Sequence, residues 1–220
     1  MKLILSLTLI WALSSTAGAL VCQTCSNLLC SSTVAVTCTS ATMCVTASSL
    51  VNVSGTTEQQ IIKACASSSL CPAAGSQTFS ETTGFSSAVI SALCCSTNNC
   101  NSDTLPFPAV QSYNSLQCFS CDSLFATECT TPIQCRGVED RCYQTNVTVG
   151  STSTSVSGCA SRNGCAAAAN LGNLLSMQSN VDIKTETTCC TTSLCNSVTS
   201  VTASSGMIHL LLGLLVFTFY

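Results

Sequence analysis

Cysteine is the residue type of this 220-residue chain whose number and spacing could carry chemistry, because twenty of its side chains are thiols. Two pairs have Cys-x-x-Cys spacing, Cys22 with Cys25 and Cys118 with Cys121, and thiolates at this spacing can bind zinc. When the same thiols pair with one another, they form disulfides that stabilise a fold. The compartment decides between these uses, since an oxidising lumen favours disulfides and a reducing cytosol favours metal binding.

The N-terminal segment indicates the compartment. Lys2 supplies a positive charge, residues 3–13 form an almost unbroken apolar run, and residues 17–19 are the small residues that a signal peptidase reads. We therefore predict a secretory signal peptide over residues 1–19, with Leu20 as the first mature residue. An uncleaved anchor helix is the alternative, but the apolar run is shorter than the ~20 residues that span a bilayer. Secretion predicts disulfides, and we expect no metal, no cofactor and no free thiol.

Histidine is missing from the mature chain that we predict. His209, the one histidine, lies in a C-terminal segment that we expect to be removed, so no Ser-His-Asp, Cys-His or histidine-zinc site can form. Nine acidic residues are thinly spread, with Glu139 and Asp140 as the only adjacent pair. Five basic residues against nine acidic ones give the mature chain a net charge of −4, so nucleic acid is not an expected partner. The composition predicts that this protein is not an enzyme.

The cysteines fall into two runs of ten with similar spacing. From Cys22 to Cys100 the gaps between successive cysteines are 2, 4, 7, 5, 20, 5, 22, 0 and 4 residues, and from Cys118 to Cys195 they are 2, 7, 5, 6, 16, 5, 23, 0 and 4. Each run ends on Cys-Cys-x4-Cys-Asn. A repeat of this kind predicts two domains, each with its own small core stapled by disulfides.

A proline-containing segment separates the two units. We place the first domain at residues 20–101, the second at residues 116–196 and a linker at residues 102–115, where Pro106 and Pro108 fix φ and remove two backbone donors. This composition predicts an extended and only partly flexible connection. The alternative, a last strand of the first domain, is disfavoured by two prolines so close together.

Within each unit the pattern is that of β-structure. Residues 33–38, 45–53 and 143–149 are rich in Val and Thr and read as strands. Turn dipeptides follow the last two segments, at residues 54–55 and 150–151. We therefore predict a hairpin between the fifth and sixth cysteines of each unit.

A short helix is predicted between the seventh and eighth cysteines of the second unit. Alanines at residues 166–169, followed by Leu171, Leu174 and Leu175, place leucines on one helical face, although Gly172 weakens the pattern. We expect that face to pack in the core, with membrane or ligand contact as the alternative.

Two N-glycosylation motifs occupy corresponding places. Asn52-Val53-Ser54 and Asn146-Val147-Thr148 both fall in the predicted hairpins. We expect each hairpin to expose an edge that carries a glycan, at Asn52 and at Asn146. An unused sequence match is the alternative for each site.

The one cluster of charged residues is Arg-Gly-Val-Glu-Asp-Arg, at residues 136–141 of the second unit. It could recognise a partner. We expect a solvated loop of mixed charges instead, because such charges contribute little unless they are desolvated.

The C-terminal segment has the three parts of a signal for glycosylphosphatidylinositol attachment. Residues 207–220 are apolar, residues 197–206 are a small polar spacer, and small residues precede or begin that spacer. Spacer length favours Asn196 or Ser197 as the attachment residue, with Ser200 as a third choice. We predict removal of the tail and attachment to the outer leaflet of the plasma membrane. A transmembrane helix is the alternative, disfavoured because fourteen residues are short for a span and no Lys or Arg follows them.

The Cys-x-x-Cys start, the Cys-Cys-x4-Cys-Asn ending and the two terminal signals closely resemble the lymphocyte antigen 6 and urokinase receptor superfamily of three-finger domains. The resemblance covers both units and implies a small disulfide-rich all-β fold, with two tandem three-finger domains of five disulfides each. It also implies the pairing of the cysteines, which spacing alone leaves open. The implied pairs are Cys22–Cys44, Cys25–Cys30, Cys38–Cys65, Cys71–Cys94, Cys95–Cys100, Cys118–Cys142, Cys121–Cys129, Cys135–Cys159, Cys165–Cys189 and Cys190–Cys195, with Asn101 and Asn196 closing the two units.

Two-domain members of this superfamily include anchored surface receptors, adhesion proteins and secreted gamma-type phospholipase inhibitors, whose layout is similar to that of this chain. The resemblance implies a non-enzymatic, glycosylphosphatidylinositol-anchored cell-surface glycoprotein that binds a protein partner through its finger loops, as a receptor, adhesion protein or modulator. The alternative is a secreted, soluble inhibitor or ligand of the phospholipase-inhibitor type. The finger tips vary among members, so the resemblance implies no particular ligand.

Overall fold

The computed structural model of the chain describes residues 19–27, 29–39, 43–123, 126, 128–149, 152–168 and 183–197. Within these ranges the chain forms eleven strands and one short helix, at residues 162–168. The prediction of an all-β fold is confirmed. The expected signal peptide, the C-terminal tail, the turn at residues 150–151 and the three leucines of the expected helix lie outside the described residues, except for Ala19 at the end of the signal.

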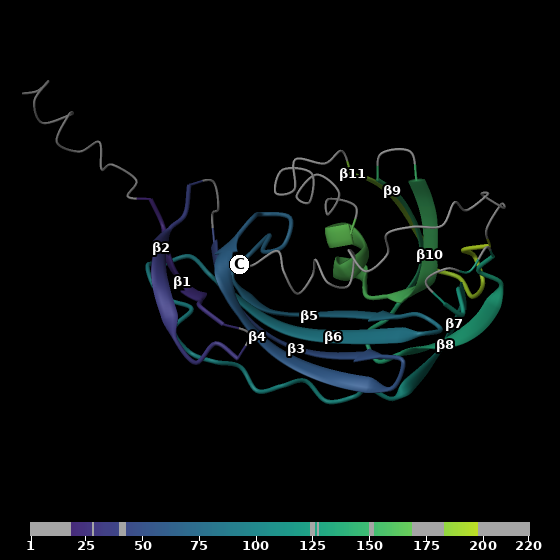
Figure 1. The fold of residues 1–220 in the computed structure, drawn as a ribbon, viewed down its shortest axis with the longest axis horizontal. Helices are drawn as coiled ribbons and strands as arrows, with labels where there is room; N and C mark the ends of the chain where they lie inside the picture. Colours follow the sequence, from purple (N-terminus) through teal and green to yellow (C-terminus); the bar gives the residue numbers. More distant parts are fainter. Residues whose placement is uncertain are drawn as a thin grey trace, which may run out of the picture.

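The first domain contains three antiparallel hairpins, which we call fingers one, two and three (Figure 1). Finger one is β1 (Val21–Cys25) with β2 (Thr33–Thr37), finger two is β3 (Met43–Val53) with β4 (Thr56–Ala66), and finger three is β5 (Gly75–Thr82) with β6 (Ser86–Cys95). The predicted strands at 33–38 and 45–53 correspond to β2 and β3. Ser54 and Gly55 form the predicted turn. Their φ angles of 50° and 88° are both positive, which is typical of a favoured two-residue hairpin loop.

The second domain repeats this plan. β7 (Tyr113–Ser120) pairs with β8 (Thr131–Arg136), β9 (Arg141–Val149) pairs with β10 (Thr152–Ala160), and β11 (Ile183–Cys190) pairs with the other side of β9. The strand predicted at residues 143–149 lies within β9. β7 begins at Tyr113, so the last three residues of the expected linker are strand.

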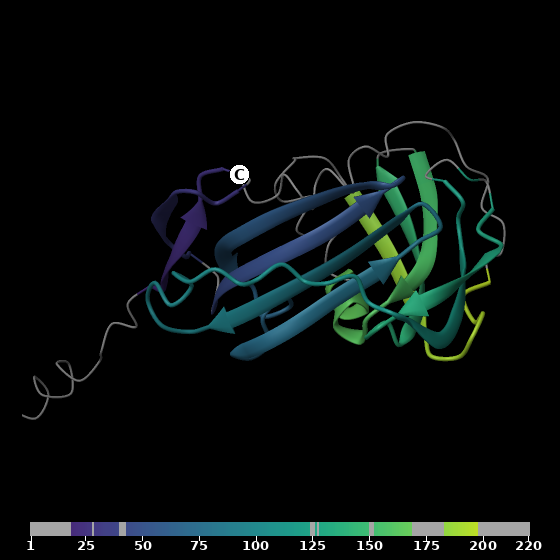
Figure 2. The same ribbon diagram turned by 90° about the horizontal axis from the view of Figure 1, so that it is seen from below.

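A single seven-stranded sheet runs through both domains, in the order β11-β9-β10-β5-β6-β3-β4. The two halves join where β5 of the first domain pairs with β10 of the second, through Thr82 opposite Cys159 and Glu81 opposite Ala160. β9 and β10 run across the direction of the strands of the first domain (Figures 1 and 2). The sequence repeat predicts two cores, and it does not indicate that one sheet connects them.

Small side chains and disulfides form the cores. The largest apolar cluster lies in the first domain, where Val45, Ala47, Ala64 and Ala92 pack with Phe79 and neighbouring cysteines. The main cluster of the second domain consists of four buried cysteines, Cys118, Cys135, Cys142 and Cys159. Because these domains bury so little aliphatic surface, the disulfides must supply much of the stability.

The segment between the domains lies along the face of the first-domain sheet (Figure 1). Thr46 Oγ1 donates to the carbonyl of Asp103 at 3.2 Å, and Ser48 Oγ donates to the carbonyl of Pro106 at 2.7 Å. Lys63, which is buried, donates through Nζ to the carbonyl of Ser102. These contacts fix an extended segment against β3 and β4.

Candidate binding surface

The cysteines form ten disulfides, five in each domain, and the pairs coincide with those implied by the family resemblance. Two groups of sulfur atoms lie within 4.8 Å of one another, from Cys22, Cys38 and Cys65 and from Cys118, Cys135 and Cys159. Each of these sulfurs belongs to a disulfide, so in the oxidised chain none offers a thiolate to a metal.

Asn101 and Asn196 close the two domains with the same hydrogen bonds. Asn101 accepts from the Gln23 amide at 2.9 Å and donates to the carbonyls of Gln23 and Val45 at 2.9 and 3.0 Å. Asn196 accepts from the Phe119 amide at 2.9 Å and donates to the carbonyls of Phe119 and Tyr143, both at 2.8 Å. Both side chains are buried and tie the C-terminal end of a domain to its first and third strands.

Glu139 lies at the junction of the two domains and is only 1% exposed. Its Oε1 accepts hydrogen bonds from Ser80 Oγ and Thr82 Oγ1 of β5, each at 2.7 Å, and its Oε2 accepts from the Arg136 amide at 2.7 Å. Burial raises the pKa of the Glu139 carboxyl above its ordinary value, and these hydrogen bonds oppose that change. A carboxylate of the second domain thus satisfies two hydroxyls of the first.

Backbone and hydroxyl contacts extend the junction on both sides of Glu139. The Ser161 amide donates to the Ser80 carbonyl at 2.8 Å, and the Ser80 amide donates to Ser161 Oγ at 3.1 Å. Asn163, in the short helix, donates through Nδ2 to the Thr78 carbonyl at 2.9 Å. The Gly84 amide donates to Ser120 Oγ at 2.8 Å. Through these contacts, polar groups of one domain pair with polar groups of the other across the junction.

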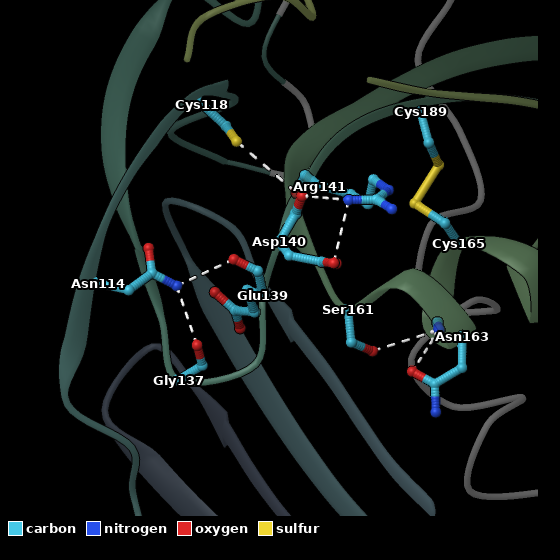
Figure 3. Close-up of polar contacts among 11 residues, drawn as sticks. Asn114, Cys118, Gly137, Glu139, Asp140, Arg141, Ser161, Asn163, Cys165 and Cys189 are labelled. Carbon is cyan, nitrogen blue, oxygen red and sulfur yellow. Dashed lines mark hydrogen bonds and ion pairs between the residues drawn. A yellow bond between two sulfur atoms is a disulfide. The ribbon is translucent and has the colours of Figure 1, made fainter. Parts of the chain in front are cut away.

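The expectation of a solvated loop at residues 136–141 is wrong for Glu139 and correct for its neighbour Asp140. Asp140 is largely exposed and forms an ion pair with Arg141 at 3.0 Å. Asn114 holds the loop by donating to the carbonyls of Gly137 and Glu139 at 3.1 and 2.9 Å (Figure 3). Nothing in the local sequence distinguishes the two acids, because the partners of Glu139 lie in the other domain.

A cavity of about 230 Å³ adjoins Glu139, between fingers two and three of the first domain and the interdomain segment. Leu50, Asn52, Val110 and Arg136 contribute to its lining. Arg136 packs over the Tyr113 ring, 4.4 Å from its centroid, and donates through Nη2 to the Tyr113 hydroxyl, while its buried Nε has no hydrogen-bond partner. The cavity is too small for a drug-sized ligand.

The hairpin that contains Asn52 exposes an edge, β4, as expected, whereas the hairpin that contains Asn146 does not, and neither motif itself lies on an edge strand. β3, which carries Asn52, has β4 and β6 on its two sides, and β9, which carries Asn146, has β10 and β11. Asn52 donates through Nδ2 to Thr57 Oγ1 at 2.9 Å, and Asn146 accepts from Ser155 Oγ at 2.6 Å. Both side chains are half-buried. Glycosylation at the two sites stays a prediction.

Exposed apolar side chains gather on finger one of the first domain. Leu29 at its tip is 69% exposed, and Val34 and Val36 of β2 are 57% and 41% exposed. This finger and residues 191–197 lie at opposite ends of the molecule (Figures 1 and 2). An extracellular domain can use such a protruding apolar surface to contact a protein.

Among the helices of the described residues, none is long and apolar enough to cross a membrane. No curated protein sequence matches this chain. A family model does match, the u-PAR/Ly-6 domain, over residues 18–103 and again over residues 114–198. Domains of this kind are typically extracellular protein-binding modules and are generally not enzymes. The two matches cover most of the chain, which therefore belongs to the u-PAR/Ly-6 family and contains two of its domains.

Proposed function

We propose that this chain is a glycosylphosphatidylinositol-anchored cell-surface glycoprotein that binds a protein partner through finger one of its first domain. The observation that carries the proposal is that finger one and the segment of residues 191–197 lie at opposite ends of the molecule (Figures 1 and 2). An anchor just after the second domain holds that domain near the membrane and presents finger one away from it. The interdomain contacts keep this orientation fixed, because β5 and β10 share a sheet.

Ser197 suits the attachment better than Asn196 does. The lipid is joined at the carbonyl of the attachment residue, so the enzyme must reach the peptide bond that follows it. The Asn196 side chain is 5% exposed and holds the domain end in place, whereas Ser197 is exposed. The third choice, Ser200, lies outside the described residues.

The anchor is tested on cells that express the full chain with an epitope tag inserted before Leu20. Phosphatidylinositol-specific phospholipase C should release the tag into the medium, and mass spectrometry of the released protein should find phosphoethanolamine on Ser197. The Ser197→Leu variant should lose surface display, because attachment requires a small residue, and Ser200→Leu should keep it. A matched control joins residues 1–197 to an unrelated transmembrane helix, which the lipase should leave on the cell.

Resistance of the natural chain to the lipase would contradict the anchor. Protein that accumulates in the medium without its tail and without lipid would favour the soluble alternative, an inhibitor or ligand of the phospholipase-inhibitor type.

The binding half of the proposal is tested with multimerised residues 20–197 on a panel of defined cell-surface proteins. Leu29→Lys should abolish binding to the partner found, because a charge at an apolar contact is costly to desolvate. Val110→Lys is the matched control, since Val110 is equally exposed, at 69%, but lies in the interdomain segment. Equal loss in both variants would contradict recognition by finger one.

A further inference from the structure

We propose that β2 is a docking edge for a second copy of this chain, which forms an antiparallel β2–β2 pair with Ala35 on the two-fold axis. This inference goes beyond the proposed function, because its partner is the protein itself. It concerns the side of finger one, formed by the β2 backbone, and not the finger tip at Leu29.

β2 has a free edge. It pairs with β1 in a two-stranded sheet and with no other strand of the described chain. All five of its residues are exposed, and β2 lies on the outside of finger one (Figure 1). A strand in this position presents unpaired N–H and C=O groups that can pair with another strand.

The hydrogen bonds between β1 and β2 show which backbone groups of β2 point outward. The Cys38 amide donates to the Leu20 carbonyl at 2.7 Å, and the Ser26 amide donates to the Ser32 carbonyl at 3.1 Å. In an antiparallel pair, hydrogen-bonded positions alternate along the strand, so the even-numbered residues of β2 bond to β1. The amides and carbonyls of the odd-numbered residues, Thr33, Ala35 and Thr37, therefore point away from β1.

The sequence of β2 reads the same in both directions, Thr-Val-Ala-Val-Thr, with Ala35 at its centre. A two-fold axis through Ala35 pairs Thr33 with Thr37 of the other copy and Val34 with Val36. The outward-pointing residues are placed symmetrically about Ala35, so their backbone groups can form about six hydrogen bonds across the axis. The outward-pointing backbone groups and the side-chain sequence are thus both symmetric about Ala35.

Nothing on this edge opposes the approach of an identical edge. Residues 20–57 contain no Lys, Arg, His, Asp or Glu, so no like charges meet across the axis. Several other strands at the margins of the sheets carry charges or prolines of the kind that usually prevent pairing, namely Glu58 in β4, Pro132 and Arg136 in β8, and Glu186 in β11. β2 lacks such protection, and an edge this short is expected to form a weak, reversible dimer.

The dimer is tested by sedimentation of purified, disulfide-bonded residues 20–197 over a concentration series up to about 100 μM, where weak complexes assemble. The natural sequence should dimerise reversibly. Ala35→Pro should raise the dissociation constant at least ~10-fold, because it removes an outward N–H and leaves the bonds to β1 in place. Circular dichroism and thermal unfolding of the variant should match the natural protein.

A charge-swap experiment tests the position of the axis. Ala35→Lys and Ala35→Glu should each sediment as monomers, because like charges face each other across the axis, and an equal mixture of the two should form a heterodimer. Leu29→Lys, at the finger tip, should leave dimerisation unchanged. A monomeric natural sequence, or unchanged dimerisation of Ala35→Lys and Ala35→Glu alone, would overturn the proposal. The anchoring experiments above are unaffected by either result.

Discussion

The carboxylate of Glu139 in the second domain accepts a 2.7 Å hydrogen bond from the hydroxyl of Thr82 in the first. Thr82 lies opposite Cys159 at the point where the sheet passes from one domain to the other. The buried carboxylate and the shared sheet therefore act at the same place. We infer that Glu139 couples the two domains energetically.

Replacing Glu139 with Leu keeps a similar volume and leaves the buried hydroxyls of Ser80 and Thr82 without their acceptor. We expect the free energy of unfolding to fall by about 2–5 kcal/mol, and thermal unfolding to separate into two transitions. Calorimetry and urea unfolding of residues 20–197 measure both effects. Asp140→Asn is the matched control at the neighbouring acid, where we expect a change of about 0.5 kcal/mol or less. Similar results for the two variants would contradict the coupling.

The pKa of Glu139 predicts a pH dependence. Burial raises the folded-state pKa above the ordinary value of 4.5, so the folded state holds a proton that the unfolded state has released. The stability that this group contributes is fully present below that ordinary value and is lost as the pH rises through the raised pKa. The free energy of unfolding of the natural protein, minus that of Glu139→Gln, should therefore fall as the pH rises from the ordinary value of 4.5 through the raised pKa. A difference that rises with pH would show that the hydrogen bonds outweigh burial.

Gly158 allows the two domains to approach each other. A Cβ atom at this position would lie 2.2 Å from the backbone oxygen of Thr82, so Gly158→Ala must displace β5 from β10. We expect a loss of about 1–3 kcal/mol in the free energy of unfolding and faster hydrogen exchange at the junction amides. Gly75→Ala is the control, because its Cβ would meet nothing within 4 Å and its φ of 128° strains alanine at the end of β5 away from the junction, so stability should fall without faster exchange of the junction amides. Unchanged exchange in Gly158→Ala would show that the close approach is not required.

Leu194 and Asn99 occupy equivalent positions in the last loops of the two domains. Both have positive φ, 59° and 55°, and their amides donate to the Gln117 and Val21 carbonyls at 2.7 Å. Asparagine tolerates this conformation better than leucine does. Leu194→Asn should therefore stabilise the protein by about 0.5–1 kcal/mol, and Asn99→Leu should destabilise it by at least as much, because it also removes the 2.7 Å hydrogen bond that Gln23 Nε2 donates to Asn99 Oδ1. Equal effects of the same sign in urea unfolding would contradict a backbone origin.

The hairpins could be predicted from the sequence because their signals are local. The alternation at residues 45–53 and the turn residues Ser54 and Gly55 lie next to each other, and they form β3 and the turn before β4. The repeated cysteine spacing likewise indicates two units, because each unit carries its own pattern.

The domain junction could not be predicted, because its partners are distant in sequence. Glu139 lies 57 and 59 residues from Thr82 and Ser80, and Glu139 looks no different in the sequence from the exposed Asp140. The free edge of β2 also depends on which strands flank it, which a single segment does not reveal. Exposure of both faces of β2 is a property of the assembled fold.

We expect the two u-PAR/Ly-6 domains to unfold as one unit. This expectation is tested most directly by differential scanning calorimetry of residues 20–197 with all disulfides intact. One sheet and one buried junction predict a single transition, with equal calorimetric and van't Hoff enthalpies. Two separate transitions in the natural protein would contradict this, because they would show that each domain unfolds on its own.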